Sequence, residues 1–201
     1  DPPIDGWFLP AAPSLLYALK DRPRRPVLIG TNENENLMYL PNSTKSDWAA
    51  VLQKLKKESH QAIESHLKAL SFRQKLDALT TAQDYFCDSI ATADALALNG
   101  SLVFFYRFRQ GREKAGRLGA YHGAEIPYIF DTHDDWLPTS RPDRTLTAAM
   151  KSRWITFAKT GRPDDSDDWP TWSSERYAAF FQDPLSYGVI ETTLCGLIGP
   201  D

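Results

Sequence analysis

The chain has 201 residues, of which 42% are hydrophobic and 12% aromatic, and its formal net charge is −3. This aromatic content argues against disorder, because chains that cannot bury apolar surface are poor in such residues. The negative charge argues against a nucleic-acid partner, which needs concentrated Lys and Arg. No segment approaches the ~20 apolar residues of a membrane span. We therefore expect residues 1–201 to form one globular domain or a large part of one, without a nucleic-acid or membrane partner.

The first half of the chain predicts a short helix, one buried strand and a helical region. The chain begins Asp-Pro-Pro, without an initiator Met or a signal peptide, which is typical of a fragment or a mature product. Prolines up to Pro26 predict an extended surface segment with a short helix at 14–20. The apolar run 26–31 predicts a strand covered on both faces. Apolar residues at helical spacing predict helices over 47–98.

The second half adds two strands and one long helix. Residues 102–108 predict a second buried strand, residues 145–160 an amphipathic helix ended by Gly161, and residues 178–182 a last short strand. Few strands separated by long helical segments indicate an α/β fold. Two or three strands are too few for a sheet covered on both faces, so we expect the chain to be an incomplete α/β domain.

Reactive side chains follow both buried strands. Glu33 and Glu35 come after the first strand, at the end where parallel sheets place their sites, and both are candidate acids. A hydrophilic loop is the alternative for this segment. His122 follows the second strand, and its small neighbours let other groups approach the imidazole. His133 lacks a second His or Cys at ligand spacing, so neither a metal site nor a cofactor is predicted.

The cysteines and two glycosylation sequons bear on the compartment. Cys87 and Cys195 could pair, but two cysteines in a chain of this size are as consistent with free thiols as with a bond. Sequons at Asn42 and Asn99 fit surface glycosylation of a secreted protein, although such triplets also arise by chance. These features alone leave the redox state open.

Five motifs, in order along the chain, resemble the C-terminal part of the type-B carboxylesterase/cholinesterase family. Each motif is short, and their shared order and spacing carry the resemblance. The similarity extends over nearly the whole chain, and its motifs are Asp5-Gly6-x-x-x-Pro10, Gly30-x-Asn32-x-x-Glu35, His122-Gly123-x-Glu125 within 119–130, Trp154-x-x-Phe157-Ala158-x-Thr160-Gly161-x-Pro163, and Trp169-Pro170.

The resemblance implies an α/β-hydrolase fold, a few strands of a mixed, mostly parallel sheet plus several helices, with a Ser-Glu-His triad. Glu35 would be the acid, since Glu33 holds a variable position of the motif, and His122 would be the base. Met38 and Tyr39 would line the substrate pocket, with packing under the loop as an equal alternative.

Two further expectations come from matched positions. Asn36 stands where the family usually has Gly, which would change the backbone after the acid. Cys87 and Cys195 fall where secreted members often carry a disulfide, so the resemblance implies that they are bonded.

The nucleophile of such a triad is missing. No glycines in the chain frame a Gly-x-Ser-x-Gly elbow, which precedes the acid in this fold. We therefore expect the serine and the oxyanion hole on a separate N-terminal chain or segment. The predicted function is a secreted carboxylic-ester hydrolase that acts on a small-molecule ester only together with that part. The alternative is a catalytically inactive binding or adhesion module, because fold alone does not fix function.

Overall fold

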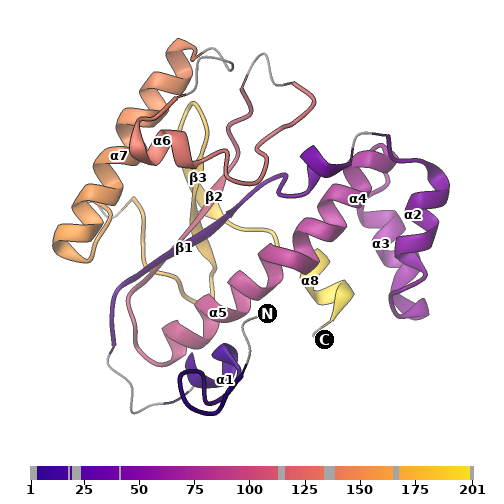
Figure 1. Cartoon of the computed structure of the whole chain (residues 1–201), viewed down its shortest axis with the longest axis horizontal. Helices are drawn as coiled ribbons and strands as arrows, with labels where there is room; N and C mark the ends of the chain where they lie inside the picture. Colours follow the sequence, from indigo (N-terminus) through magenta and orange to yellow (C-terminus); the bar gives the residue numbers. More distant parts are fainter. Residues whose placement is uncertain are drawn as a thin grey trace.

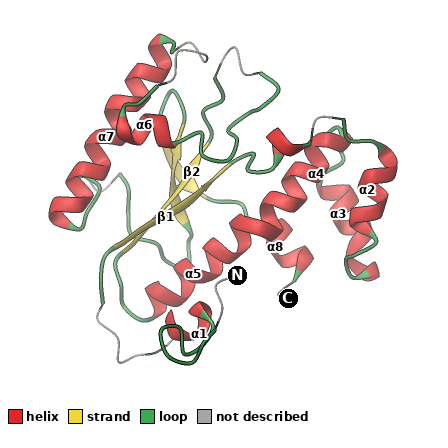
Figure 2. Ribbon diagram, viewed as in Figure 1, coloured by secondary structure: helices red, strands yellow, loops and turns green. Residues whose placement is uncertain are grey.

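The computed structural model describes residues 4–17, 19, 24–40, 42–112, 116–133, 139–164 and 168–199. Within this part of the chain the sheet has four strands in the order β1-β2-β3-β4. Figures 1 and 2 show the sheet with helices on its two sides. The first three run parallel and the fourth is antiparallel to the third. The strands are β1 (Val27–Asn32), β2 (Val103–Phe108), β3 (Tyr177–Phe181) and β4 (Ser186–Val189).

Helices fill the long connections between strands. The helices in the described residues are α1 (Pro13–Tyr17), α2 (Lys45–Leu52), α3 (His60–His66), α4 (Phe72–Thr81), α5 (Cys87–Leu98), α6 (Ile126–Phe130), α7 (Arg141–Thr160) and α8 (Thr193–Ile198). Short turns complete them: 3-10 helices η1 (Leu37–Tyr39) and η2 (Lys57–Ser59), and a π-helical turn η3 (Ala82–Phe86) that runs into α5. No helix in the described residues is both long and apolar enough to cross a membrane.

β2 is buried on both faces, as its apolar sequence predicts. Phe104 and Phe108 point to the face covered by α6 and α7, where Tyr128 and Met150 join the same core cluster. The intervening Phe105 points to the opposite face, where α5 packs. This alternation follows from the two-residue period of a strand. Figure 1 shows α7 and α5 on the two sides of the sheet. The mixed, mostly parallel α/β sheet predicted from the sequence is therefore confirmed.

A third core lies away from the sheet, among helices. Trp48 of α2, Ile63 of α3, Leu79 of α4 and Leu194 of α8 pack together and are buried. In Figure 1 these helices form a group beside the sheet, with α4 leading back through η3 to α5. This helical group contacts the site described below through α4.

One strand, β4, and two short helices, α6 and the six-residue α8, were not predicted. β4 is short and contains polar and small residues, so no apolar run marks it. α6 has five residues with Pro127 in its first turn, too few for a periodic pattern. In addition, α7 begins at Arg141, earlier than expected, because Ser140 caps it: the Ser140 Oγ accepts from the Asp143 N–H, and the Asp143 carboxylate accepts from the Ser140 N–H at 2.8 Å.

A disulfide joins Cys87, the first residue of α5, to Cys195 in α8, with 5.4 Å between the two Cα atoms. The bond ties the C-terminal helix to the layer that covers one face of the sheet. The pairing implied by the family resemblance is thus present in the structure.

Removing this bond is expected to destabilise the fold. The cysteines are 108 residues apart, and closing a loop of that size lowers the entropy of the unfolded chain by an amount equivalent to roughly 4–5 kcal/mol. Urea unfolding of Cys87→Ser/Cys195→Ser should therefore give a lower free energy of unfolding than wild type. Alkylation of the denatured, non-reduced protein should leave its mass unchanged; two added alkyl groups would contradict the bond.

Asp143 is expected to contribute pH-dependent stability. It is buried and accepts from the Tyr128 hydroxyl at 2.6 Å and the Ser140 hydroxyl at 2.7 Å. Burial opposes its charge, but these hydrogen bonds outweigh it, so the pKa of the Asp143 carboxyl lies below its ordinary value. A depressed native pKa stabilises the fold above the unfolded pKa, and this stabilisation is lost as pH falls through the native value.

Asp143→Asn should lower the free energy of unfolding at pH 7 by about 1–3 kcal/mol, because it leaves buried donors unpaired. The difference from wild type should shrink below about pH 4. The matched control is Asp131→Asn, which removes only an exposed ion pair with Lys151, a change of less than about 1 kcal/mol. A difference that stays constant from pH 7 to pH 3 in denaturant titrations would rule out the assignment.

Candidate active site

The two reactive segments meet at the carboxyl-terminal edge of the sheet. β1 and β2 run parallel and in register, so both end on the same side, at Asn32 and Phe108. The acid turn (residues 33–40) follows β1, and the histidine loop (residues 116–125) follows β2 further along the chain. The ladder extends one step beyond the strands, since the Glu33 N–H donates to the Phe108 carbonyl at 2.8 Å.

Asn34 fastens the acid turn to the histidine loop. Its N–H donates to the Ala120 carbonyl, and its Oδ1 accepts from the Ala120 N–H, both at 3.1 Å. Gly119 makes this approach possible: its φ is +61°, and a Cβ there would lie 2.4 Å from the Asn34 Oδ1. The small residues next to the histidine thus serve a close contact between the two loops.

Glu35 and His122 form the central pair of the site. The Glu35 Oε2 lies 2.8 Å from the His122 Nδ1. Only 6% of the Glu35 side chain is exposed, against 50% for His122. The other carboxylate oxygen of Glu35 accepts from the Asn32 N–H at 2.7 Å. The backbone at the end of β1 therefore holds the buried acid, whereas the imidazole is half exposed to solvent.

This arrangement fixes the chemistry available to the imidazole. A carboxylate only accepts hydrogen bonds, so the Nδ1 of His122 carries the proton in this contact. Nε2 is then the nitrogen with a free lone pair, and it can take a proton from an approaching hydroxyl. The carboxylate also stabilises the imidazolium that forms when Nε2 becomes protonated. The pair can act as a general base that is oriented by an acid.

Asn32 and Tyr85 complete the surroundings of the pair. The Asn32 side chain donates to the Tyr121 carbonyl at 2.8 Å and to Glu125 at 2.5 Å, so it joins the end of β1 to both flanks of the histidine. The Tyr85 ring lies 5.2 Å from the imidazole, centroid to centroid, and tilted by 39°. Burial, followed by the charge of Glu35, raises the pKa of the Tyr85 hydroxyl.

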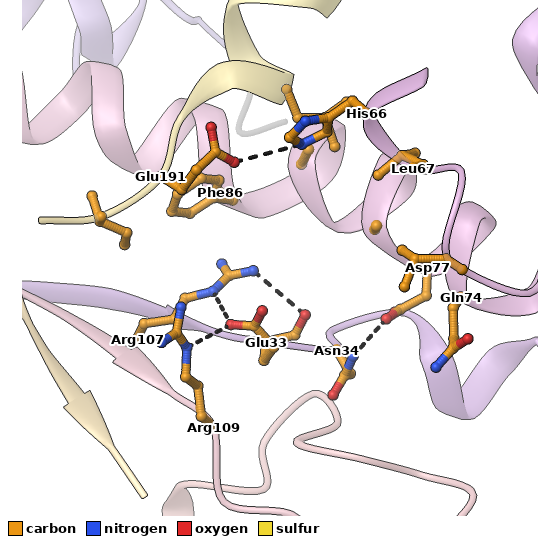
Figure 3. Close-up of a pocket in the computed structure, with 15 residues that line it drawn as sticks. Glu33, Asn34, His66, Leu67, Gln74, Asp77, Phe86, Arg107, Arg109 and Glu191 are labelled. Carbon is orange, nitrogen blue, oxygen red and sulfur yellow. Dashed lines mark hydrogen bonds and ion pairs between the residues drawn. The ribbon is translucent and has the colours of Figure 1, made fainter. Parts of the chain in front are cut away.

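Glu33, the second candidate acid, belongs to a different cluster. Its Oε2 accepts from the Nε atoms of Arg107 and Arg109, at 3.0 and 3.1 Å (Figure 3). Burial opposes the charge, but the two guanidiniums outweigh it and hold the pKa of the Glu33 carboxyl below its ordinary value. Arg107 also stacks on Phe86. A carboxylate occupied by two arginines is not available to orient a histidine, so Glu35 fills that position.

A cavity of about 280 Å³ lies beside the acid turn. It is lined by Glu33, Arg107 and Arg109 from the sheet side, and by Leu67 and Asp77 from the helical group (Figure 3). Neither Glu35 nor His122 lines it. The cavity is therefore adjacent to the reactive pair without containing it.

Three further residues of the acid turn were singled out from the sequence: Met38, Tyr39 and Asn36. Met38 and Tyr39 lie in η1 and are 38% and 61% exposed. They lie at the surface of the described residues, three and four positions after Glu35. Asn36 has φ −100°, a right-handed conformation that does not require glycine. The change from Gly therefore leaves the turn intact, and the Asn36 amide donates to Asp84 at 2.9 Å.

His133 and the two sequon asparagines lie outside the site. Both ring nitrogens of His133 are engaged, by Arg112 at 2.5 Å and Thr147 at 2.7 Å. Among the sequons, Asn42 is exposed, while the Asn99 side chain donates to the Tyr17 carbonyl. Thr147 and Arg112 are buried, which makes the His133 contacts structural.

Sequence reasoning missed the residues that support the pair. Asn32 belongs to the Gly30-x-Asn32-x-x-Glu35 motif, but no role was predicted for it. Its place at the end of the predicted strand could have indicated a role in the site. Arg73 and Asp77 of α4 lie more than thirty residues from the acid turn, and no local pattern links them to it.

Comparison with known proteins places the chain in a family. The sequence profile of the Carboxylesterase family matches residues 1–185. Neuroligin-2 of Homo sapiens is 27% identical over 196 residues, which cover 81% of this chain and 24% of that protein. Para-nitrobenzyl esterase of Bacillus subtilis (strain 168) is 27% identical over 184 residues, which cover 87% of this chain and 37% of that protein.

A solved structure supports the same fold. A structure of PNB esterase superposes with a TM-score of 0.76 at 24% sequence identity, covering 98% of this chain and 43% of that one. The chain thus spans less than half the length of these relatives. With the family profile matching most of the chain, and with this sheet, the chain belongs to the carboxylesterase family and forms part of an α/β-hydrolase fold.

Proposed function

We propose that this chain supplies the acid, Glu35, and the base, His122, of a Ser-Glu-His triad in a carboxylic-ester hydrolase. The observation that carries the proposal is the 2.8 Å contact between Glu35 Oε2 and His122 Nδ1 at the ends of two parallel strands. The buried acid and the exposed imidazole have the asymmetry that such a triad needs. Family membership supports the same reaction class.

In the proposed reaction, His122 transfers one proton in each half-reaction. Its Nε2 takes the proton of a serine hydroxyl while the serine oxygen attacks the ester carbonyl carbon. The imidazolium then gives this proton to the departing alkoxide, which leaves as the alcohol and an acyl-enzyme. A water molecule repeats the sequence: Nε2 takes its proton, the hydroxide attacks the acyl carbon, and the serine recovers its proton as the acid leaves.

The proposed serine and oxyanion hole lie on a separate N-terminal chain or segment of the same protein. No Gly-x-Ser-x-Gly stands in the 201 residues. In the described residues β1 forms one edge of the sheet, and an unpaired edge strand is a template for another strand. The relatives extend well beyond the matched region. A partner that continues the sheet past β1 would carry the missing groups.

The proposed substrate is a small carboxylic ester. Met38 beside the acid gives an apolar, uncharged wall, which suits a neutral ester better than a cation that would need an aromatic face. One relative is named for para-nitrobenzyl esters, so nitrophenyl and nitrobenzyl esters are suitable probes. No cofactor is part of the proposed reaction, because proton transfer and acyl transfer need only the side chains named.

We place the protein outside the cell. Its disulfide favours an oxidising compartment, and the sequon at Asn42 is exposed and open to glycosylation. Both features fit secretion.

An inactive binding module is the second candidate. Neuroligin-2 matches this chain at the same 27% identity as the para-nitrobenzyl esterase, so identity does not separate the two. Retention of both Glu35 and His122 in hydrogen-bond contact favours the enzyme. A partner segment without the serine elbow would favour the binding module.

Substitution of either member of the pair should abolish most activity. In the complete protein, His122→Ala should lower kcat for p-nitrophenyl acetate by roughly 10⁴- to 10⁶-fold, and Glu35→Gln by roughly 10⁴-fold, because the base is lost or misoriented. Controls are His66→Ala, an exposed histidine on α3, and Glu33→Gln, whose carboxylate binds arginines. Steady-state kinetics showing a greater loss in Glu33→Gln than in Glu35→Gln would reverse the acid assignment.

A serine-reactive organophosphate should modify the protein outside residues 1–201. The phosphoryl group transfers to the activated serine, which we place on the N-terminal part. Peptide mass spectrometry after labelling should locate the adduct in a Gly-x-Ser-x-Gly peptide, and prior His122→Ala should suppress it. An adduct on a serine of this chain, or equal labelling of the variant, would be incompatible with the divided triad.

A further inference from the structure

We propose that Arg73 of α4 is a positioning residue that sets the geometry of the Glu35–His122 pair by binding the acid turn and the histidine loop at once. The catalytic meaning of this role rests on the proposed function, whereas the geometry itself does not. Arg73 and Asp77 lie one turn apart on α4 and face the same loops. Together they connect the helical group to the site.

Arg73 binds backbone carbonyls from both segments. Its Nη2 donates to the Leu37 carbonyl at 2.8 Å and to the Arg117 carbonyl at 2.6 Å, and its Nε donates to the Leu40 carbonyl at 2.5 Å. Leu37 and Leu40 belong to the acid turn, two and five residues after Glu35. Arg117 belongs to the histidine loop, five residues before His122. One guanidinium therefore spans the two segments whose spacing determines the reactive contact.

Asp77 holds the other side of the acid turn. Its carboxylate accepts from the Asn34 side chain at 2.8 Å (Figure 3). It also accepts from the Asn36 N–H at 3.2 Å. These residues flank Glu35 directly. Asp77 is buried, which raises the pKa of its carboxyl despite the hydrogen bonds from Asn34 and Thr81. The carboxylate fixes the backbone around the acid, and Arg73 fixes the turn that follows it.

The chemistry of arginine fits this role. Three carbonyl acceptors from two segments require a planar group with several donors in fixed directions, which a guanidinium provides. An ammonium has no such fork, so Arg73→Lys would keep the charge and the aliphatic stem but lose the simultaneous contacts. In the described residues, the Asn34–Ala120 pair provides the backbone contact between the acid turn and the histidine loop. Loss of the guanidinium should let the histidine loop shift against the acid turn.

A purely structural role for Arg73 predicts something different. If Arg73 only anchors α4, its loss should lower stability and leave the His122 Nδ1–H bond to Glu35 as it was. A positioning role requires that bond to change in protein that remains folded. The imidazole Nδ1 proton reports this directly, since a proton held by a carboxylate gives a downfield NMR signal with slow exchange.

The experiment is proton NMR of the downfield region in the complete protein that carries this chain. His122→Gln identifies the signal by its disappearance. The test variant is Arg73→Gln, and Arg73→Lys is the milder second variant. The matched control is Arg144→Gln, because Arg144 also donates to a loop carbonyl, that of Thr139 at 2.8 Å, but on α7 away from the site. Circular dichroism monitors folding of each protein.

We expect the signal to shift upfield and exchange faster in Arg73→Gln, less so in Arg73→Lys, and to stay unchanged in Arg144→Gln. Where the protein hydrolyses esters, kcat should fall roughly 10- to 100-fold with KM within about twofold, as expected for a misplaced base. An unaltered signal in folded Arg73→Gln overturns the proposal. Failure of both Arg73 variants to fold also overturns it, since Arg73 would then be required for the fold itself.

The two proposals fail in different ways. A protein without esterase activity whose Nδ1 signal still depends on Arg73 would refute the hydrolase assignment and support the positioning role. An active hydrolase with wild-type kcat in Arg73→Gln and an unchanged signal would support the hydrolase assignment and refute the positioning role.

Discussion

The parallel pairing of β1 with β2 is the constraint on which the site depends. Because the strands run the same way and in register, the segments that follow them leave the same edge of the sheet. An acid three residues beyond β1 and a histidine on the loop after β2 can then meet at 2.8 Å. Both strands are held by side chains on both faces, so the edge from which the loops depart is rigid.

Charge is distributed around the acid turn so that each carboxylate has a separate task. Glu33 is bound by Arg107 and Arg109, Asp77 by amide donors of the turn, and Glu35 by the Asn32 N–H and His122. Three acidic side chains can lie close together because each has its own donors. The result is a turn whose backbone is held on both sides of Glu35, which keeps the Glu35–His122 pair in one arrangement.

The sequence predicted the parts of this arrangement that depend on local pattern. The apolar runs 26–31 and 102–108 gave β1 and β2, since burial on both faces leaves a continuous apolar signal. β4 and α6 carried no such signal. Residue patterns alone could not choose between Glu33 and Glu35. The resemblance favoured Glu35, and Glu33 is paired instead with Arg107 of β2 and with Arg109 just after that strand. The contacts of Arg73 depend on how α4 docks, which spacing does not encode.

In the proposed hydrolase, the exposed nitrogen of His122 faces a serine supplied by another part of the protein. The most direct measurement is an experimental structure of the complete protein, in which the distance from the His122 Nε2 to the nearest serine oxygen is read. We expect a Gly-x-Ser-x-Gly serine with its Oγ at about 2.6–3.2 Å from that nitrogen. A His122 Nε2 covered by a non-reactive side chain, with no serine within reach, would contradict it.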